Sequence, residues 1–556
     1  MKLNLLVPAA LLAALLCSCI KEDKRMGSGL VDSSLQYDTY TAEFLLEDLE
    51  MRKADNLSGF SDSKIVIGAI RDDVFGLTTR TSAFTLIPAN DTLDLGTNPV
   101  PVKFDVHFAC DTVSFKDPSQ QHILQNVNVF ALTKAVDAKQ SGTNQDLSVG
   151  TTRISKGIPV VNGTDSLTIE FTDDFAREYI SKIQALENED HAITSYDDYV
   201  AALPGVCLSV DPPAGNGGRI NLFELSILSL SSGQYYRNNN IALLTINSTY
   251  DGVKKDTTFL FIPGEPTFYY EPDYLTNNTK FYQYAFNRTS HETVDGKAGA
   301  KAYIEGGGGL KPVVTAKELR DKALAEIAKK GDPSKAIINH ATIVLPFEVV
   351  DEDYEALNFY PTILSPTCMI KSVDEETGTE GYTFAGLSDA SASTENQGNI
   401  DRSNLRYAPD ITHHFQELVR LSDLEKLTNY DVWFIIVHTE TKEVASSSSA
   451  ESEYLQNLLY ASYYNSLYGG YGGYGYGGYG YGYGSYGYGG YGGYGGYSNY
   501  YNYLMLSNYL SSASSSQTQT TTELDKDRYY CGILNGPATT STRKPKVRFT
   551  FSIPKK

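Results

Sequence analysis

The stretch VKFDVHF, residues 102–108, alternates strictly between apolar and polar side chains. Successive side chains of a strand point to opposite faces, so this stretch predicts a β-strand with one buried and one solvent-facing side. The stretch KVRFTFSI, residues 546–553, alternates in the same way almost to the end of the sequence. Shorter strand-like runs occupy residues 65–70, 127–132, 167–171, 206–210, 220–230, 242–246, 258–262, 341–350 and 432–438. Many short strands predict a mainly β chain, built as an antiparallel β-sandwich or jelly roll.

A few helices are expected at the periphery of these sheets. Asp173 or Asp174 can cap a helix that runs to Leu186, with Phe175, Tyr179, Ile183 and Leu186 on its buried face. Ser195 can cap a second, short helix. Residues 316–330 predict an amphipathic helix that stops at Gly331, and residues 412–421 predict another.

Length and charge limit the classes of function. The chain has 556 residues, of which 41% are hydrophobic, so most of it can bury a core. Its 46 basic and 67 acidic residues give a net charge of −21. This charge argues against a nucleic-acid partner, which needs a basic surface, and against electrostatic adhesion to anionic lipids.

The N-terminus carries the strongest localisation signal. Lys2 precedes an apolar run at residues 3–16, which is the pattern of a secretory signal peptide. Leu16, Ser18 and Cys19 then resemble a bacterial lipobox, with an aliphatic residue three positions before the cysteine and a small one directly before it. The resemblance implies cleavage before Cys19 and acylation of that residue, while an ordinary cleaved signal peptide is the simpler alternative. Acyl chains contribute about 0.8 kcal/mol of membrane binding per buried CH₂ group.

The residues after Cys19 predict where the anchored protein faces. Lys21, Glu22 and Asp23 resemble the surface-export signal of Bacteroidota lipoproteins, which implies an outer-membrane lipoprotein that faces the cell exterior. The alternative is a solvated tether with incidental charge. Four Asp-Thr or Asp-Ser pairs also resemble the O-glycosylation sequon of exported proteins in that phylum, although such pairs are common in β-rich chains. Their acceptor residues are Thr92, Thr112, Ser166 and Thr257.

A glycine-tyrosine tract occupies residues 468–497, with 17 glycines, 12 tyrosines and one serine. Such a segment cannot bury enough apolar surface to offset its backbone entropy, so residues 443–527 are expected to be a disordered insertion between two late strands. The tyrosine rings offer stacking faces for sugars or for partner loops, whereas a passive linker is the plainer alternative. The stacking candidates are Tyr468, Tyr471, Tyr474, Tyr476, Tyr479, Tyr481, Tyr483, Tyr486, Tyr488, Tyr491, Tyr494 and Tyr497.

The sequence carries no catalytic signature. HExxH, GxSxG, CxxC and Walker patterns are absent, so no catalytic residue, metal ligand or cofactor is expected. The run EGGGGLK at residues 305–311 lacks the spacing of a phosphate loop and predicts a glycine turn. The adjacent His413 and His414 would point about 100° apart on a helix, which disfavours a shared metal ion. The cysteines at 110, 207, 368 and 531 fit buried free thiols better than a zinc site, with disulfide pairing left open.

Several passages in order resemble the domain of unknown function 4270 family of Bacteroidota surface lipoproteins. The resemblance covers about residues 40–440 and the final strand; the tyrosine-glycine insertion and Cys207 depart from the family pattern. It implies an all-β, lipid-anchored outer-membrane protein and brings no established activity. The passages are IGAIRDDVFGLTT at 67–79, residues 127–137, LPGVCLSV at 203–210 with GGRI at 217–220, AYIEGGGGLK at 302–311 and INHATIVLP at 338–346.

These observations predict an organisation and three classes of function. The expected segments are a signal peptide at 1–18, Cys19 and a tether to 40, β-rich regions at 41–265 and 266–442, the insertion at 443–527 and a final strand region at 528–556. The first hypothesis is a noncatalytic accessory or binding subunit that docks on an outer-membrane β-barrel. The second is a glycan-binding or adhesive module that uses tyrosine stacking. The third is a glycoside hydrolase with an unrecognised carboxylate pair.

Overall fold

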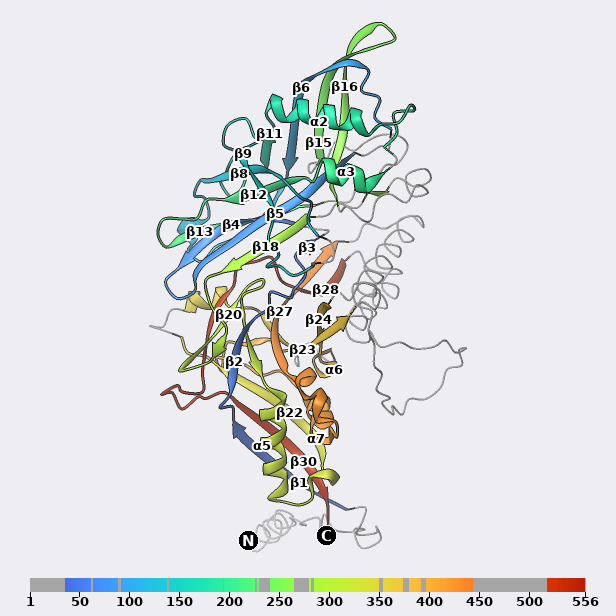
Figure 1. The fold of residues 1–556 in the computed structure, drawn as a ribbon. Coiled ribbons are helices and arrows are strands. Elements are labelled where there is room, and N and C mark those ends of the chain that lie inside the picture. The colour runs from blue at the N-terminus through green and yellow to red at the C-terminus, as the bar shows by residue number, and fades with distance from the viewer. Residues whose placement is uncertain are drawn as a thin grey trace, which may run out of the picture.

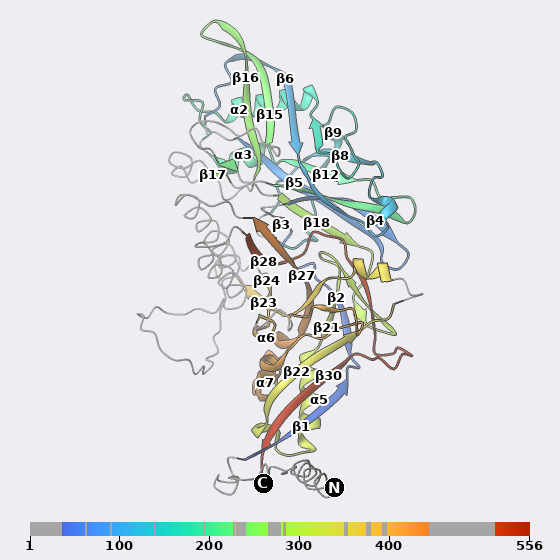
Figure 2. The same ribbon diagram turned by 180° about the vertical axis from the view of Figure 1, so that it is seen from behind.

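The computed structural model describes residues 36–61, 64–88, 92–137, 140–193, 195–225, 228–229, 241–264, 280–281, 285–349, 354–373, 380–391, 397–443 and 518–555. This part of the chain is mainly β, with antiparallel sheets and few helices in a β-sandwich-like arrangement, which confirms the predicted fold class. Two lobes are stacked along one long axis (Figures 1 and 2). The N-terminal lobe holds strands β3 to β18, and the C-terminal lobe holds β1, β2 and β19 to β30.

The N-terminal lobe is built on a 14-stranded sheet. Its main path runs β10 (Val160–Val161), β8 (Gln125–Leu132), β12 (Val206–Val210), β5 (Gly76–Pro88), β16 (Val253–Gly264), β15 (Ile241–Tyr250), β6 (Thr97–Phe108) and β11 (Leu167–Glu170). Branching from it are β3 (Phe60–Ser61), β4 (Lys64–Asp72), β7 (Cys110–Ser114), β9 (Val149–Arg153), β13 (Gly217–Glu224) and β18 (Ala285–His291), while β14 (Leu228–Ser229) pairs with β17 (Lys280–Phe281). The short 3₁₀ helix η3 covers Pro118–Gln120.

Strand β6 confirms the predicted alternation from Phe104 onward, whereas Val102 is 50% exposed instead of buried. Phe104, Val106 and Phe108 are buried in the lobe core, while the polar residues between them point to the other face. Helix α2 (Asp173–Leu186) and helix α3 (Tyr196–Ala202) cover that core. The Phe104 ring lies 5.2 Å from the ring of Tyr179 on α2.

The two helices differ slightly from the prediction. Ser195 caps α3 as expected, because its hydroxyl accepts a hydrogen bond from the Asp198 amide. The N-cap of α2 is Thr172 instead of Asp173 or Asp174, since the Thr172 hydroxyl reaches the Phe175 amide. The buried face of α2 also turns by about one residue and holds Ala176, Tyr179, Ile180 and Ile183, leaving Phe175 and Leu186 half-buried.

The C-terminal lobe contains two main sheets. The five-stranded sheet runs β1 (Tyr37–Leu45), β30 (Lys546–Pro554), β22 (Ile337–Pro346), β26 (Arg406–Tyr407) and β25 (Ile400–Asp401). The seven-stranded sheet runs β19 (Gly296–Lys297), β2 (Leu49–Lys53), β21 (Leu310–Val314), β27 (Val432–Glu443), β23 (Ile363–Val373) and β24 (Glu380–Gly386), with β28 (Thr518–Leu524) beside β27. Strands β20 (Lys301–Glu305) and β29 (Cys531–Asn535) form a separate pair.

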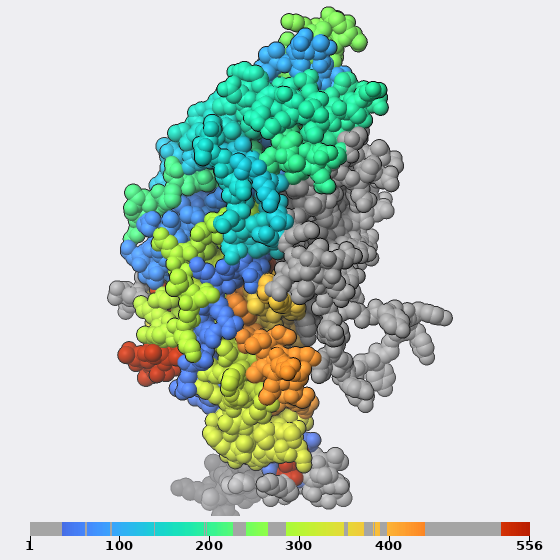
Figure 3. All heavy atoms as spheres, in the orientation of Figure 1, coloured from blue at the N-terminus to red at the C-terminus, as the bar shows by residue number. Residues whose placement is uncertain are grey.

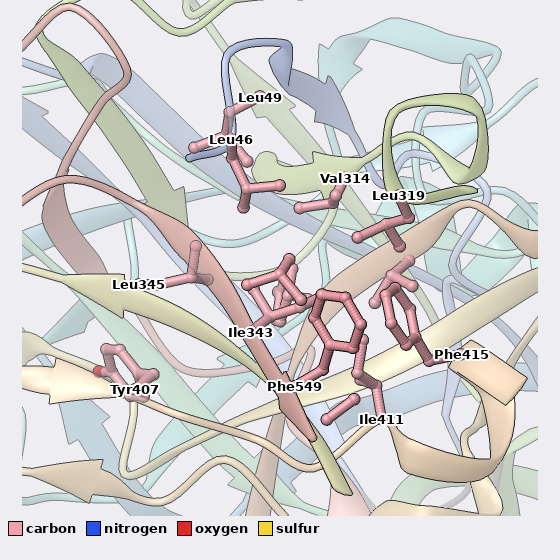
Figure 4. Close-up of a cluster of buried hydrophobic side chains, with 14 of the residues drawn as sticks. Leu46, Leu49, Val314, Leu319, Ile343, Leu345, Tyr407, Ile411, Phe415 and Phe549 are labelled. Atoms are coloured by element: carbon pink, nitrogen blue, oxygen red, sulfur yellow. The ribbon is translucent and has the colours of Figure 1, made fainter. Parts of the chain in front are cut away.

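Helices close the core of the C-terminal lobe. Helix α5 (Ala316–Ala328) is capped by Thr315, and α7 (Thr412–Arg420) lies beside it. Figure 4 shows Leu319 of α5 and Phe415 of α7 pointing toward Phe549 of β30. The remaining helical segments are α6 (Ser388–Ser391), η4 (Pro333–Lys335), η6 (Tyr354–Phe359) and η8 (Leu424–Tyr430). Among the described residues, no helix is long and apolar enough to cross a membrane.

The two lobes do not follow one another along the chain, as the expected regions 41–265 and 266–442 would. Strand β1 pairs along its whole length with β30, so Tyr37 lies opposite Pro554. Strand β2 pairs with β21 of the C-terminal lobe, and β18 pairs with β5 of the N-terminal lobe. The N-terminal lobe is therefore inserted between β2 and β19. Both described chain ends lie at the outer end of the C-terminal lobe.

The insertion between the late strands is also shorter than expected. Strand β27 continues to Glu443, and residues 518–524 form β28, which pairs with it. Residues 444–517 lie outside the described part of the chain. Glu443 and Thr518 are directly opposite partners, so the two ends of this segment are held side by side.

Candidate functional site

The glycine turn between β20 and β21 lies where the two lobes meet. Its four glycines, Gly306–Gly309, leave no room for side chains, because a β-carbon on any of them would lie within 2.6 Å of a neighbouring atom. Gly307 also has a φ of +56°, in the left-handed region. The closest atoms to such a β-carbon are the Arg528 carbonyl oxygen for Gly306 (2.4 Å), Arg80 Nη2 for Gly307 (2.5 Å), Thr143 Oγ1 for Gly308 (2.4 Å) and Glu305 Cβ for Gly309 (2.5 Å).

The ammonium group of Lys311 is bound by backbone carbonyl oxygens of the turn. Its ammonium donates to the carbonyl oxygens of Glu305 (2.6 Å), Gly307 (2.9 Å) and Gly309 (2.9 Å), and the residue is only 1% exposed. Burial lowers the pKa of Lys311 to about 7, although the Glu305 carboxylate opposes that shift. In a phosphate loop, backbone N–H groups converge on an anion. Here carbonyl oxygens converge on a cation, which agrees with the prediction of a turn and gives it the opposite electrostatic sense.

The carboxylate of Glu305 is held by three donors. Thr293 Oγ1 donates at 2.5 Å and the Leu310 amide at 2.9 Å, both to Oε2, while His291 Nδ1 lies 3.3 Å from Oε1. Burial alone would raise the pKa of this carboxyl, but the hydrogen bonds hold it below its ordinary value. Glu305 is therefore a buried anion at the junction.

His291 is locked as a neutral imidazole between Glu305 and Arg80. Its Nε2 lies 3.2 Å from Arg80 Nη1, which can only donate, so Nε2 accepts and Nδ1 carries the proton that is shared with Glu305. Burial lowers the pKa of His291 to about 4, with the Glu305 contact opposing and the nearby Arg80 reinforcing the shift. Because both ring nitrogens are engaged, the imidazole has no lone pair left to accept a proton from Thr78 Oγ1, 3.4 Å from Nδ1.

Arg80 completes this group, which we call the junction cluster: Arg80, His291, Glu305 and Lys311. Arg80 comes from β5 and His291 from β18 of the N-terminal lobe, while Glu305 and Lys311 flank the glycine turn of the C-terminal lobe. Burial lowers the pKa of Arg80 to about 10. Within the part of the chain that the structure describes, only one of its nitrogens, Nη1, has a hydrogen-bond partner. The junction cluster therefore connects the two lobes through hydrogen bonds between buried polar and charged side chains.

An apolar contact lies beside the junction cluster. Val66, Ile70 and Ile220 of the N-terminal lobe pack against Tyr529 and Cys531 of the segment that leads into β29. On the face shown in Figure 3, the described atoms of the two lobes are in continuous contact. The lobes are thus joined by an apolar patch and by the junction cluster together.

The site residues predicted from the sequence lie away from the junction cluster or outside the described part of the chain. Cys19, Lys21, Glu22, Asp23 and the twelve tyrosines of the tract lie outside the described residues. The four sequon residues are spread over the N-terminal lobe: Thr92 is exposed at a bridge to Ala192, Thr112 is half-buried on β7, Ser166 is half-buried before β11, and Thr257 is half-buried on β16. The structure does not bring them together.

The paired histidines and the cysteines occupy structural positions. His414 is buried and its Nε2 lies 3.0 Å from the Tyr430 carbonyl, whereas His413 is exposed. No group of three or more potential ligands that could hold a metal ion occurs within the described ranges. Cys110, Cys207, Cys368 and Cys531 are free thiols. Burial raises the pKa of the last three to about 12, so they are unreactive at neutral pH.

The comparisons with known proteins leave the family open. No protein-family model, curated protein or solved structure matches this chain. The resemblance to the domain of unknown function 4270 family therefore stays a prediction from the quoted passages.

The sequence predicts the glycine turn but does not indicate that buried charges surround it. Glu305 and Lys311 flank the four glycines, and this polar pair was the local signal available. Arg80 and His291 come from strands that the sequence places more than 200 residues from each other, so their meeting follows only from the pairing of β5 with β18.

Proposed function

We propose that this chain is a lipid-anchored, outward-facing outer-membrane protein that acts as a noncatalytic binding subunit of a β-barrel partner. The observation that carries the proposal is the pairing of β1 with β30, which places the first described residues at one end of the long axis. A tether that begins at Cys19 would reach this end through residues 20–36. Fully extended, this tether would be at most about 60 Å long. The N-terminal lobe would then be the part farthest from the bilayer.

The charged groups of the junction fit a binding protein. Glu305, His291 and Lys311 direct their polar atoms at each other and at the backbone of the glycine turn. Such an arrangement stiffens the connection between the lobes, which suits a subunit that must hold its far end at a fixed distance from the membrane.

The far end presents a polar surface for contact. On the outer face of β15 and β16, Thr245 and Thr258 share a hydrogen bond of 2.9 Å, and Asn247 donates to Asp256 at 2.7 Å. The hairpin ends in a two-residue turn, Asp251 and Gly252, with φ values of +51° and +81°. Polar, hydrogen-bonding surfaces of this kind are typical of reversible protein interfaces.

The anchor itself is tested by changing Cys19 to alanine. We expect the variant to leave the membrane pellet and appear in the soluble extracellular or periplasmic fraction, because a chain without acyl groups has no stable membrane attachment. Membrane fractionation with immunoblotting measures this. A Cys17→Ala variant is the matched control and should stay in the pellet. Retention of the Cys19 variant in the pellet would contradict lipid anchoring.

The partner is tested by gentle-detergent purification with mass spectrometry, using two tag positions. One tag follows Lys556, beside the tether, and the other is inserted at the exposed turn of Asp251 and Gly252. We expect a stoichiometric β-barrel protein with the C-terminal tag. If the β-barrel protein co-purifies with the C-terminal tag but not with the turn tag, the contact lies at the hairpin of β15 and β16. Purification of the chain without a companion from both tagged forms, also after chemical cross-linking in intact cells, would overturn the β-barrel proposal.

The tyrosine-glycine segment can be removed cleanly to test its share in binding. Glu443 and Thr518 are directly opposite, so residues 444–517 can be replaced by Asn-Gly, the preferred two-residue hairpin turn. We expect the melting temperature to change by less than about 3 °C, since β27 and β28 keep their pairing. Glycan arrays with and without the segment then test the glycan-binding alternative. A collapse of the fold would contradict the hairpin assignment.

A further inference from the structure

Arg80 presents an unused edge of its guanidinium inside the protein. The residue is 1% exposed, and Nη1 is engaged by His291 Nε2 at 3.2 Å. Both Nε and Nη2 are buried and lack a hydrogen-bond partner among the described residues. These two N–H groups lie on the same edge of the planar fork and point in parallel, which is the geometry that grips two oxygens of one anion.

A buried guanidinium with two N–H donors that lack an acceptor is unusual. Leaving a buried donor unmet costs about 1–3 kcal/mol, and more for a charged group, so folded proteins satisfy nearly all of them with protein, water or ions. Arg80 is the only arginine in the described part of the chain for which both nitrogens of this edge are buried without a hydrogen-bond partner. The described residues therefore supply no acceptor to this edge, which leaves it open to water or to an ion.

The neighbouring carboxylates do not fill this edge. Glu305 already accepts from His291, Thr293 and the Leu310 amide. Asp527 is half-buried nearby, and its charge acts on Arg80, but no hydrogen bond joins the two. Burial raises the pKa of Asp527, which weakens it further as a counter-ion. The ionised Glu305 thus directs its hydrogen bonds to groups other than Arg80.

We propose that the free edge of Arg80 binds a small planar oxyanion with a single negative charge, such as a carboxylate, bicarbonate or nitrate ion. The peptide of Gly307 packs so closely on Nη2 that a β-carbon there would lie 2.5 Å away, which limits the ligand to a few atoms.

The proposed ion would act on the junction between the lobes. Arg80 belongs to the N-terminal lobe, whereas Gly307 and the segment at 525–530 belong to the C-terminal lobe. That segment joins β28 to β29, and Lys526 donates to the Ser58 carbonyl at 2.7 Å beside the cluster. An ion that satisfies Arg80 would stabilise the docked arrangement of the lobes and the base of the β27–β28 hairpin.

The test is the melting temperature of the full chain with sodium formate, sodium nitrate or sodium chloride at one constant ionic strength. We expect formate and nitrate to raise the melting temperature in a saturable way, by on the order of 3 °C at an ion concentration far above the dissociation constant. Chloride, which is spherical and cannot bridge both donors, should have a several-fold smaller effect. The absence of a saturable difference between formate and chloride overturns the proposal.

Two variants separate this site from general salt effects. Arg80→Lys keeps the positive charge but removes the parallel donors, so the formate effect should disappear. Asp527→Asn removes a carboxylate whose charge acts on Arg80 and would repel an anion, so formate should bind several-fold more tightly. This variant changes none of the four residues of the junction cluster. If Asp527 itself occupies the Arg80 edge in solution, Asp527→Asn destabilises the protein and formate stabilises only that variant; this result also overturns the proposal.

Discussion

Replacing Gly306 with alanine is expected to lower the free energy of unfolding by about 3 kcal/mol, at the upper end for overpacking. The new β-carbon would lie 2.4 Å from the Arg528 carbonyl oxygen and 3.0 Å from the Tyr530 amide nitrogen. Both atoms are backbone, so no side chain can turn away to make room. The Gly306 amide also donates to the Tyr530 carbonyl at 3.2 Å, and this bond must lengthen as the strands separate.

Urea denaturation followed by far-UV circular dichroism and by tryptophan fluorescence measures this effect. Trp433 is the single tryptophan of the chain and is buried on β27, so its emission reports on the C-terminal lobe. Gly299→Ala is the matched control, because a β-carbon there meets nothing within 4 Å. The control should stay within about 0.5 kcal/mol of the parent. Equal denaturation midpoints for the two variants would show that the turn is not packed against the backbone of residues 528–530.

Replacing Lys311 with methionine is expected to lower the free energy of unfolding by about 3 kcal/mol at pH 8. Methionine fills a similar volume but leaves the carbonyl oxygens of Glu305, Gly307 and Gly309 without the donor they share. The three carbonyls would then point at one another across the turn. Because the removed group is a buried titratable amine, the loss should also depend on pH.

The sign of that dependence follows from the lowered pKa of Lys311. Burial sets it at about 7 in the folded chain, whereas an unfolded lysine titrates near about 10.4. Between these values the unfolded state binds one more proton, so the parent gains stability as pH rises above 7, by up to about 1.4 kcal/mol per pH unit. The methionine variant lacks this gain, and its deficit relative to the parent should widen from pH 7 to pH 8.5.

The comparison must be made as a difference between the two proteins. Cys207, Cys368 and Cys531 have pKa values raised to about 12 by burial, so ionisation of these thiols in the unfolded state lowers stability at higher pH in both proteins alike. Their contribution cancels in the difference. Lys317→Met is the matched control, since Lys317 is exposed on α5 and pairs with Asp321 on the surface. A deficit that does not change between pH 7 and pH 8.5 would contradict a buried, titrating Lys311.

Local periodicity was enough to predict the strands and several helix ends. Phe549 and Phe551 alternate with polar residues in the sequence, and both are fully buried on β30. Ser195 stands before a short helix and caps it. These features depend on neighbours within a few residues, because side-chain direction repeats every two residues in a strand and capping needs only the first helical turn.

Strand partners could not be predicted in this way. Strand β1 has 9 residues and pairs with β30 more than 500 residues later, and no local pattern states that preference. Strand β28, TQTTTEL, lacks an apolar face and lies next to low-complexity sequence, so it was assigned to the insertion. It forms because β27 extends beyond the sheet and offers an unpaired backbone edge, which any strand-compatible segment can satisfy.

The junction cluster shows the same limit for the candidate site. Arg80 and Thr78 are polar residues on a strand, and the sequence gives no sign that their side of the strand faces another lobe and not solvent.

The sequence by itself determined the mainly β character, the glycine turn, the negative net charge and the signals that predict a lipid anchor at Cys19. Each of these follows from composition or from spacing over a few residues. The tertiary structure alone decided that the N-terminal lobe is inserted in the C-terminal one, that both described chain ends meet at one end, and that Arg80 and Lys311 are buried together. The physical reason is that burial and pairing between distant segments depend on the whole packed fold, whereas alternation and turns depend on adjacent residues.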